Sequence, residues 1–148
     1  MTLAWLTGIY LVVVAVHDWV PLGRLNDLSP ENQPPRGTRV AASVGNIVPV
    51  VALFVIAIVW SDRPLPLGAA IFAVAYIAVF VVLMWLSWYQ PYFFGASEQR
   101  ERDAEREYGG TVQVLPRRGT HVRPNLMHVI LHVLFIVVAI GFLVKIFG

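Results

Sequence analysis

The C-terminal segment of the chain restricts the fold more than any other part of the sequence. From Pro124 to Gly148 the only ionisable side chains are His128, His132 and Lys145. A helix rises 1.5 Å per residue, so this run is long enough to cross the ~30 Å hydrocarbon core of a bilayer. Pro124 suits the first turn of such a helix, where its missing N–H costs nothing. The segment therefore predicts a membrane-spanning helix over 124–148.

The composition extends this prediction to the whole chain. Hydrophobic residues make up 57% of the 148 residues and charged residues 14%, whereas about 25% of the residues in soluble domains are charged. Three further apolar segments have the length of a span, at about 3–22, 40–60 and 67–89. We therefore expect an all-α integral membrane protein with one domain, 1–148, built as a bundle of four transmembrane helices.

The distribution of basic residues predicts the orientation of this bundle. Four spans place the loops 23–39 and 90–123 on one side of the membrane and both termini on the other. The two loops hold nine arginines, whereas the opposite side holds only Arg63 and Lys145. Because basic residues are enriched in cytoplasmic loops, we expect both loops in the cytoplasm and both termini outside, in the inner (plasma) membrane. The third loop should also contain a short polar helix, Glu98–Tyr108.

Polar residues interrupt all four apolar segments near their predicted cytoplasmic ends. His128 and His132 are four residues apart and lie on one stripe of a helix, with Asn125 three residues before them. An ionisable side chain inside a span is costly unless a partner meets it, so it indicates a functional site. We expect a pocket between the helices at this depth, with ligand-binding residues in the spans and the first loop: His17, Asp18, Asn26, Asp27, Asn46, Asn125, His128 and His132.

The first span makes a specific prediction about this pocket. It reaches the necessary length only if it includes His17 and Asp18, which then need partners at the membrane edge. The nearest candidates by depth are Asn125 and His128, so we expect the end of the first span to contact the start of the fourth. In that contact an ionised Asp18 would accept hydrogen bonds and orient a histidine.

Several chemistries could use such a pocket. A divalent metal could be held by His128, His132, His17 and Asp18, and haem b could be held by His17 facing His128 or His132. A third reading needs no cofactor: the histidines and Asp18 would form a protonatable or ligand-binding pocket. The chain has no cysteine and no Ser-His-Asp arrangement in a convincing context, so its residues leave open whether it is an enzyme.

The function predicted from these residues is a small membrane protein that binds a small solute, a lipid headgroup or a metal ion in a cytoplasm-facing pocket. One alternative is an oligomeric channel or transporter whose path these residues line. Another is an accessory subunit of a membrane complex that docks through its charged third loop. Nucleic acid is not an expected partner, because the arginines flank apolar segments and the net charge is only +2.

Overall fold

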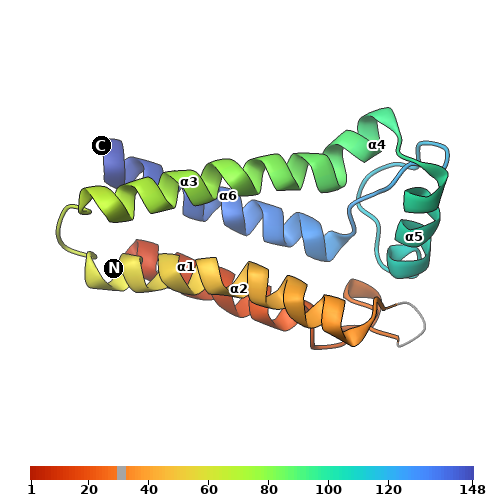
Figure 1. Cartoon of the computed structure of the whole chain (residues 1–148), viewed down its shortest axis with the longest axis horizontal. Helices are drawn as coiled ribbons and strands as arrows, with labels where there is room; N and C mark the ends of the chain where they lie inside the picture. Colours follow the sequence, from red (N-terminus) through yellow and green to blue (C-terminus); the bar gives the residue numbers. More distant parts are fainter. Residues whose placement is uncertain (30–32) are drawn as a thin grey trace.

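The computed structural model describes residues 1–29 and 33–148, and the described chain is all-α (Figure 1). One isolated bridge joins Gln113 and Asn125, without forming a strand. The elements in chain order are α1 (Thr2–His17), a 3₁₀ turn (Gly23–Leu25), α2 (Arg36–Val59), α3 (Leu67–Met84), a π-helical turn (Trp85–Tyr89), α4 (Gln90–Phe94), α5 (Glu98–Tyr108) and α6 (Leu126–Phe147).

Three of these helical segments are long and apolar enough to cross a membrane. They are α2, the 28-residue stretch Leu67–Phe94 that joins α3 to α4, and α6. The fourth apolar helix, α1, has 16 residues and is therefore about 24 Å long. It ends at His17 rather than continuing to residue 22 as predicted. Asn26 donates hydrogen bonds to the carbonyls of His17 and Val20, which holds the chain in a turn there, and Pro21 could not extend the helical ladder.

Other predicted boundaries also shift, each for a local reason. α2 begins at Arg36 instead of residue 40, directly after Pro35. The third span continues to Phe94 instead of ending at residue 89. Pro91 lies in the first turn of α4, and the carbonyl of Ser87, four residues before it, accepts a hydrogen bond from Arg100 instead. The fourth helix begins at Leu126. Pro124 therefore precedes the helix, and Asn125 is its N-cap.

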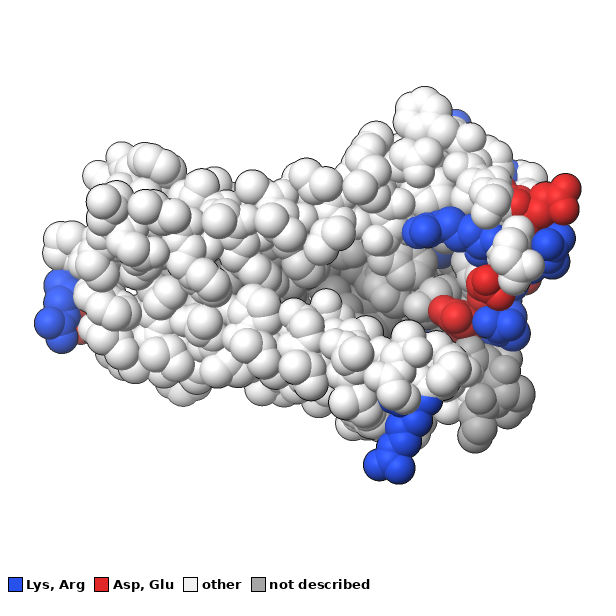
Figure 2. Space-filling model, viewed as in Figure 1, with Lys and Arg blue, Asp and Glu red and all other residues white. Residues whose placement is uncertain are grey.

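The four apolar segments form two layers. α1 packs against α2 and α6, α6 also packs against α3, and α2 barely touches α3. Figure 1 shows the pair α1 and α2 lying beside the pair α3 and α6, with both termini at one end and α5 with the long loops at the other. The arginine-rich loops therefore share one end of the molecule. In Figure 2 the charged side chains gather at the two ends of the molecule, mainly the loop end, and the face between them is uncharged.

The part of the bundle nearest the termini has a close-packed apolar core. Tyr10, Leu53, Phe135 and Phe142 are each at most 1% exposed. α1 and α6 approach closely at Gly141, where an added Cβ would lie 2.8 Å from the Leu3 side chain. Helices in lipid associate through close packing at small residues, because no hydrophobic effect drives them together there.

The loop end is tied together by backbone hydrogen bonds. α5 has the predicted bounds, and Ser97 is its N-cap: the Ser97 side chain accepts a hydrogen bond from the N–H of Arg100. After α5, the N–H of Val112 donates to the carbonyl of Arg24 at 2.7 Å, and the carbonyl of Val112 accepts from the N–H of Leu126 at 2.8 Å. One residue thus joins the first loop to the start of α6, which brings the ends of α1, α5 and α6 together.

Candidate functional site

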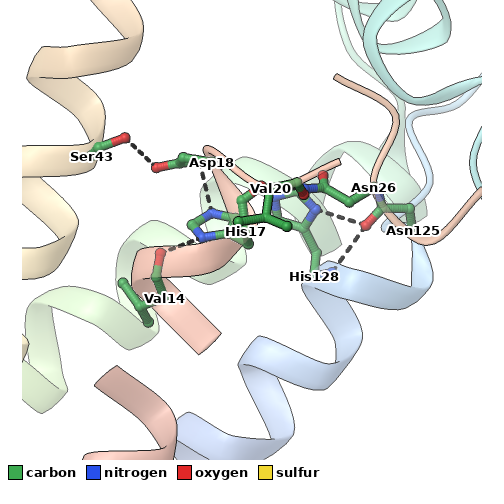
Figure 3. A network of polar contacts seen from close by, with 8 residues as sticks. All are labelled: Val14, His17, Asp18, Val20, Asn26, Ser43, Asn125 and His128. Carbon is green, nitrogen blue, oxygen red and sulfur yellow. Dashed lines mark hydrogen bonds and ion pairs between the residues drawn. The ribbon is translucent and has the colours of Figure 1, made fainter. Parts of the chain in front are cut away.

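The end of α1 carries a hydrogen-bonded chain of three side chains (Figure 3). Nε2 of His17 lies 3.0 Å from Oδ1 of Asp18, and Ser43 of α2 donates from its hydroxyl to Oδ2 at 2.5 Å. On its other side, Nδ1 of His17 lies 2.6 Å from the carbonyl oxygen of Val14. Both ring nitrogens of His17 therefore have partners within the protein.

The hydrogen-bond partners of His17 and Asp18 determine the net charge that these two side chains carry together. A carbonyl can only accept, so Nδ1 of His17 carries a hydrogen. A second hydrogen must lie between Nε2 and the Asp18 carboxyl group, because two bare acceptors would repel at 3.0 Å. Whichever atom holds this hydrogen, His17 and Asp18 together carry no net charge. The prediction that Asp18 orients a histidine therefore applies to its neighbour His17, and not to a histidine of α6.

The start of α6 holds a second fixed pair. Oδ1 of Asn125 accepts a hydrogen bond from the backbone N–H of His128 at 2.9 Å, which caps the helix. The same oxygen lies 2.8 Å from Nδ1 of the His128 ring. Asn125 is 1% exposed. The residue predicted to share a stripe with the histidines instead caps their helix and orients the first of them.

His128 lies in an aromatic box contributed by three other elements. Its ring centroid is 4.0 Å from that of Trp88, 5.3 Å from that of Tyr108 in α5, and 6.0 Å from that of His17. The predicted contact between the end of α1 and the start of α6 is therefore present. Burial, and then the negative charge of Glu107, raise the pKa of Tyr108, so its phenol is neutral at ordinary pH.

His132 lies one helical turn further into the span. Its side chain is buried, and its ring centroid is 6.3 Å from that of His128, as expected for one stripe of α6. Nδ1 of His132 is 3.1 Å from the hydroxyl of Tyr89, so each histidine of α6 has one nitrogen engaged by a neighbouring side chain.

These side chains border a cavity of about 270 Å³ between the helices. Its polar lining comes from all four apolar segments: His17, Asn46, Ser87, Trp88, His128 and His132. The rest of its lining consists of Tyr10, Val14, Phe80, Leu83, Met84 and Leu131. A second cavity of about 140 Å³ lies on the loop side. His17 and His128 line both cavities, so this pair of rings separates them.

The predicted ligand-binding residues fall into three groups. His17, Asn46, His128 and His132 line the main cavity, and Asn46 is exposed on its open side. Asp18 and Asn125 do not line the main cavity but orient His17 and His128, which do. The remaining two, Asn26 and Asp27, lie outside the main cavity: Asn26 holds the end of α1, and Asp27 accepts hydrogen bonds from Ser29 and lines the loop-side cavity.

Four residues of the site were missed in the sequence. Trp88 and Tyr89 look like interfacial anchors, because they belong to an aromatic cluster at the end of a span. Tyr108 could have been noticed in the sequence, because it is the only aromatic residue in the mostly charged segment Glu98–Tyr108. Ser43 had none, because only the three-dimensional fold brings it to Asp18.

The geometry does not favour the predicted cofactors. Within residues 1–29 and 33–148, no three His, Asp or Glu side chains are grouped to hold a metal ion. Both nitrogens of His17 are already engaged, so it is not free to ligate. The His17 and His128 rings meet edge to face, at an interplanar angle of 88°, and leave no space for a haem between them.

Comparisons with known proteins leave the site to be interpreted from this geometry alone. Scans of protein-family models, of curated proteins and of solved structures found no match to the chain.

Proposed function

We propose that the protein binds an amphiphilic small molecule in the cavity between its helices, with the polar end of the ligand against the histidines. The observation that carries this proposal is the mixed lining of the cavity. Histidine, asparagine and serine side chains border it together with the apolar side chains of Phe80, Leu83, Met84 and Leu131. A site with both kinds of lining complements a molecule that has both a polar head and an apolar chain.

The side of the cavity that faces α2 and α3 supports entry from the membrane. These two helices hardly contact each other, and Figure 2 shows a hollow between the two layers towards the loop end. Leu83 lines the cavity but is 54% exposed, so its outer surface would lie in lipid. A chain attached to a bound head could therefore leave the cavity between α2 and α3.

The size of the cavity agrees with a partly enclosed ligand. Its volume of about 270 Å³ is slightly below the ~300–1,000 Å³ usual for small-molecule sites. A polar head and the first part of a chain would fill it. On the loop side it borders the ring pair of His17 and His128, and Tyr108 packs against His128.

The proposed setting is the inner membrane, with α1 as a fourth span and both termini outside. α1 is shorter than the hydrocarbon core, but local thinning and the flanking residues Trp19 and Val20 can accommodate a short helix. The arginine-rich loops share one end of the molecule, and nine basic residues against two favour the cytoplasm for that end. Reporter domains fused after Gly95 and after Gly148 should then lie on opposite sides. Reporters on the same side would contradict four spans.

Photocrosslinking in nanodiscs tests the binding proposal. The probe is dioleoylglycerol with a diazirine in one acyl chain, and peptide mass spectrometry maps the labelled residues. We expect labelling at Leu83, Met84 and Leu131, which line the cavity, and we expect unlabelled dioleoylglycerol to compete with it.

The molecule also offers an internal control for unspecific lipid contact. An apolar groove of about 640 Å³ lies between α1 and α2 and is lined by Trp5, Ile9, Val12, Phe54 and Ile58 among others. Labelling in this groove should not be displaced by low concentrations of unlabelled probe. If the cavity residues are labelled no more than the groove, and without competition, the proposed function is wrong.

The two alternative functions lack a comparable observation. A path inside one chain would have to cross the end of the bundle near the termini, where Tyr10, Phe135 and Phe142 are packed with at most 1% exposure, so the oligomeric channel or transporter would need its path between copies of the chain. A docking role for the third loop would need a surface specialised for a partner. Instead, the ion pairs of α5, such as Arg102 with Glu98, are exposed and lie within the helix.

A further inference from the structure

We infer that the polar end of the ligand is an uncharged group that donates a hydrogen bond, of the kind that a hydroxyl provides, and that it faces Nε2 of His128. This inference rests on the proposed function and narrows it to neutral amphiphiles such as long-chain alcohols and diacylglycerols. Three features of the cavity lead to it: the charge of the lining, the state of His17 and Asp18, and the hydrogen on His128.

The lining contains no permanently charged side chain. Among the described residues that border the main cavity there is no Lys, Arg, Asp or Glu. A phosphate or carboxylate head placed there would lose its hydration without gaining a partner of opposite charge, which is costly in a site surrounded by lipid. Arg100 approaches this region, but its Nη2 donates to the backbone carbonyl of Ser87 and its side chain is not part of the lining.

His17 and Asp18 do not supply the missing charge. Their side chains share one hydrogen and are neutral as a pair, and Val14 and Ser43 satisfy their outer atoms. Figure 3 shows this chain of contacts running from Ser43 through Asp18 to His17 and Val14. An anionic head would therefore meet neither a free cation nor a free donor on His17.

The hydrogen on His128 determines what the ligand must offer. The backbone N–H of His128 can only donate, so the Asn125 atom facing it must be the amide oxygen. That oxygen also faces Nδ1 of the ring, so Nδ1 carries the hydrogen. In the neutral ring Nε2 is then a bare acceptor, and within residues 1–29 and 33–148 the hydrogen bonds of His128 involve its backbone N–H and Nδ1 and not Nε2. A ligand group that meets Nε2 must donate.

A competition experiment in nanodiscs tests this inference. The photoreactive dioleoylglycerol is displaced by three unlabelled competitors with the same acyl chains: dioleoylglycerol, its 3-acetyl ester and dioleoylphosphatidic acid. The ester can accept but cannot donate, and phosphatidic acid is charged. We expect dioleoylglycerol to compete about tenfold better than either, because one lost hydrogen bond to a buried acceptor costs about 1.4 kcal/mol.

Replacing Asn125 by serine separates orientation of the ring from stability of the helix. Serine can still cap α6 but is too short to hold Nδ1 of His128, so the ring can place its hydrogen on either nitrogen. We expect the variant to keep the thermal stability of the parent while its preference for the alcohol over the ester falls towards one.

The outcomes distinguish this inference from the proposed function. If all competitors displace the probe equally, or if phosphatidic acid is the strongest, the inference is overturned while binding in the cavity stands. An unchanged preference in Asn125→Ser also overturns it. If no probe labels the cavity above the groove between α1 and α2, the proposed function itself fails.

Discussion

The two halves of the bundle are built from the same helices but packed in opposite ways. Towards the termini, Phe135, Val138 and Phe142 of α6 are at most 2% exposed and lie in a core of apolar side chains. Towards the loops, the same helix presents His128 and His132 to a cavity of about 270 Å³. Close packing fills the first half, whereas hydrogen bonds between side chains shape the second.

This difference indicates that one half of α6 holds the bundle together and the other half borders the cavity. Lipid is as apolar as the side chains it surrounds, so packing density holds helices together in a membrane. The half near the termini supplies that density. The half near the loops can then leave space beside buried polar groups, each held by a specific partner: Asp18 with His17, Asn125 with His128, and Tyr89 with His132. Substitutions in the two halves should therefore affect different measurements.

Phe142→Ala should have the largest effect, on stability alone. Phe142 is completely buried, and its loss would leave a void on the order of 100 Å³, which costs about 2 kcal/mol at ~24 cal/mol per Å³. Thermal unfolding in detergent should show the loss, while the folded fraction binds the photoreactive probe with unchanged affinity. Phe147→Ala, at a residue 76% exposed, is the matched control and should alter neither quantity.

His128→Ala and His132→Ala should instead weaken ligand binding and leave thermal stability largely unchanged. Both residues line the cavity, so each variant should weaken competition by dioleoylglycerol, by about tenfold at His128, where the proposed hydrogen bond is lost. His121→Ala is the control, because His121 lies 3.0 Å from the carbonyl of Tyr92 and outside the main cavity. Equal weakening in all three variants would argue for a binding site in the loops.

Asp18 should matter through its hydrogen bonds rather than its charge. Asp18→Ala leaves Nε2 of His17 and the hydroxyl of Ser43 without their shared partner, and should weaken binding several-fold, at about 1 kcal/mol for a lost hydrogen bond. Asp18→Asn can donate to Nε2 and accept from Ser43, so it should restore most of the affinity. If asparagine is as harmful as alanine, the neutral pair inferred for His17 and Asp18 is wrong.

The smallest effect is expected outside the bundle, at Glu101 of α5. A hydrogen bond from the Thr120 hydroxyl holds the pKa of Glu101 below its ordinary value of 4.5. A lowered carboxyl pKa stabilises the fold above the ordinary value, and this contribution is lost as the pH falls through the lowered one. Thr120→Val should bring the pKa of Glu101 back towards 4.5, as measured by NMR titration of the side chain.

The sequence was sufficient for the apolar helices because length and hydrophobicity are local properties. It also located His128 and His132 on one stripe of a helix near the loop end. The end of the first helix could not be predicted, since it depends on Asn26, nine residues beyond His17. Likewise, the contact of Ser43 with Asp18 spans 25 residues. Such contacts depend on how loops and helices meet in space, which hydrophobic patterns do not encode.

The role of Asn125 also could not be predicted from the sequence, although its partner His128 is only three residues away. Its spacing to His128 was recognised, but as three residues along one helical stripe. In the structure the helix starts at Leu126, two residues later than predicted, so Asn125 is a cap with extended backbone and its side chain turns back to the ring. With this shift of one boundary, Asn125 is a residue that caps α6 and orients the His128 ring.

Single-cysteine labelling tests the central claim, a ligand cavity that opens to lipid between α2 and α3, most directly. The chain has no cysteine, so Leu83→Cys and Val82→Cys each introduce one thiol. Both positions are 54% exposed, but only Leu83 lines the cavity. We predict that a bilayer-soluble maleimide reacts with both, and that dioleoylglycerol slows the reaction at position 83 and leaves position 82 unchanged. Equal rates with and without dioleoylglycerol at both positions would contradict the account.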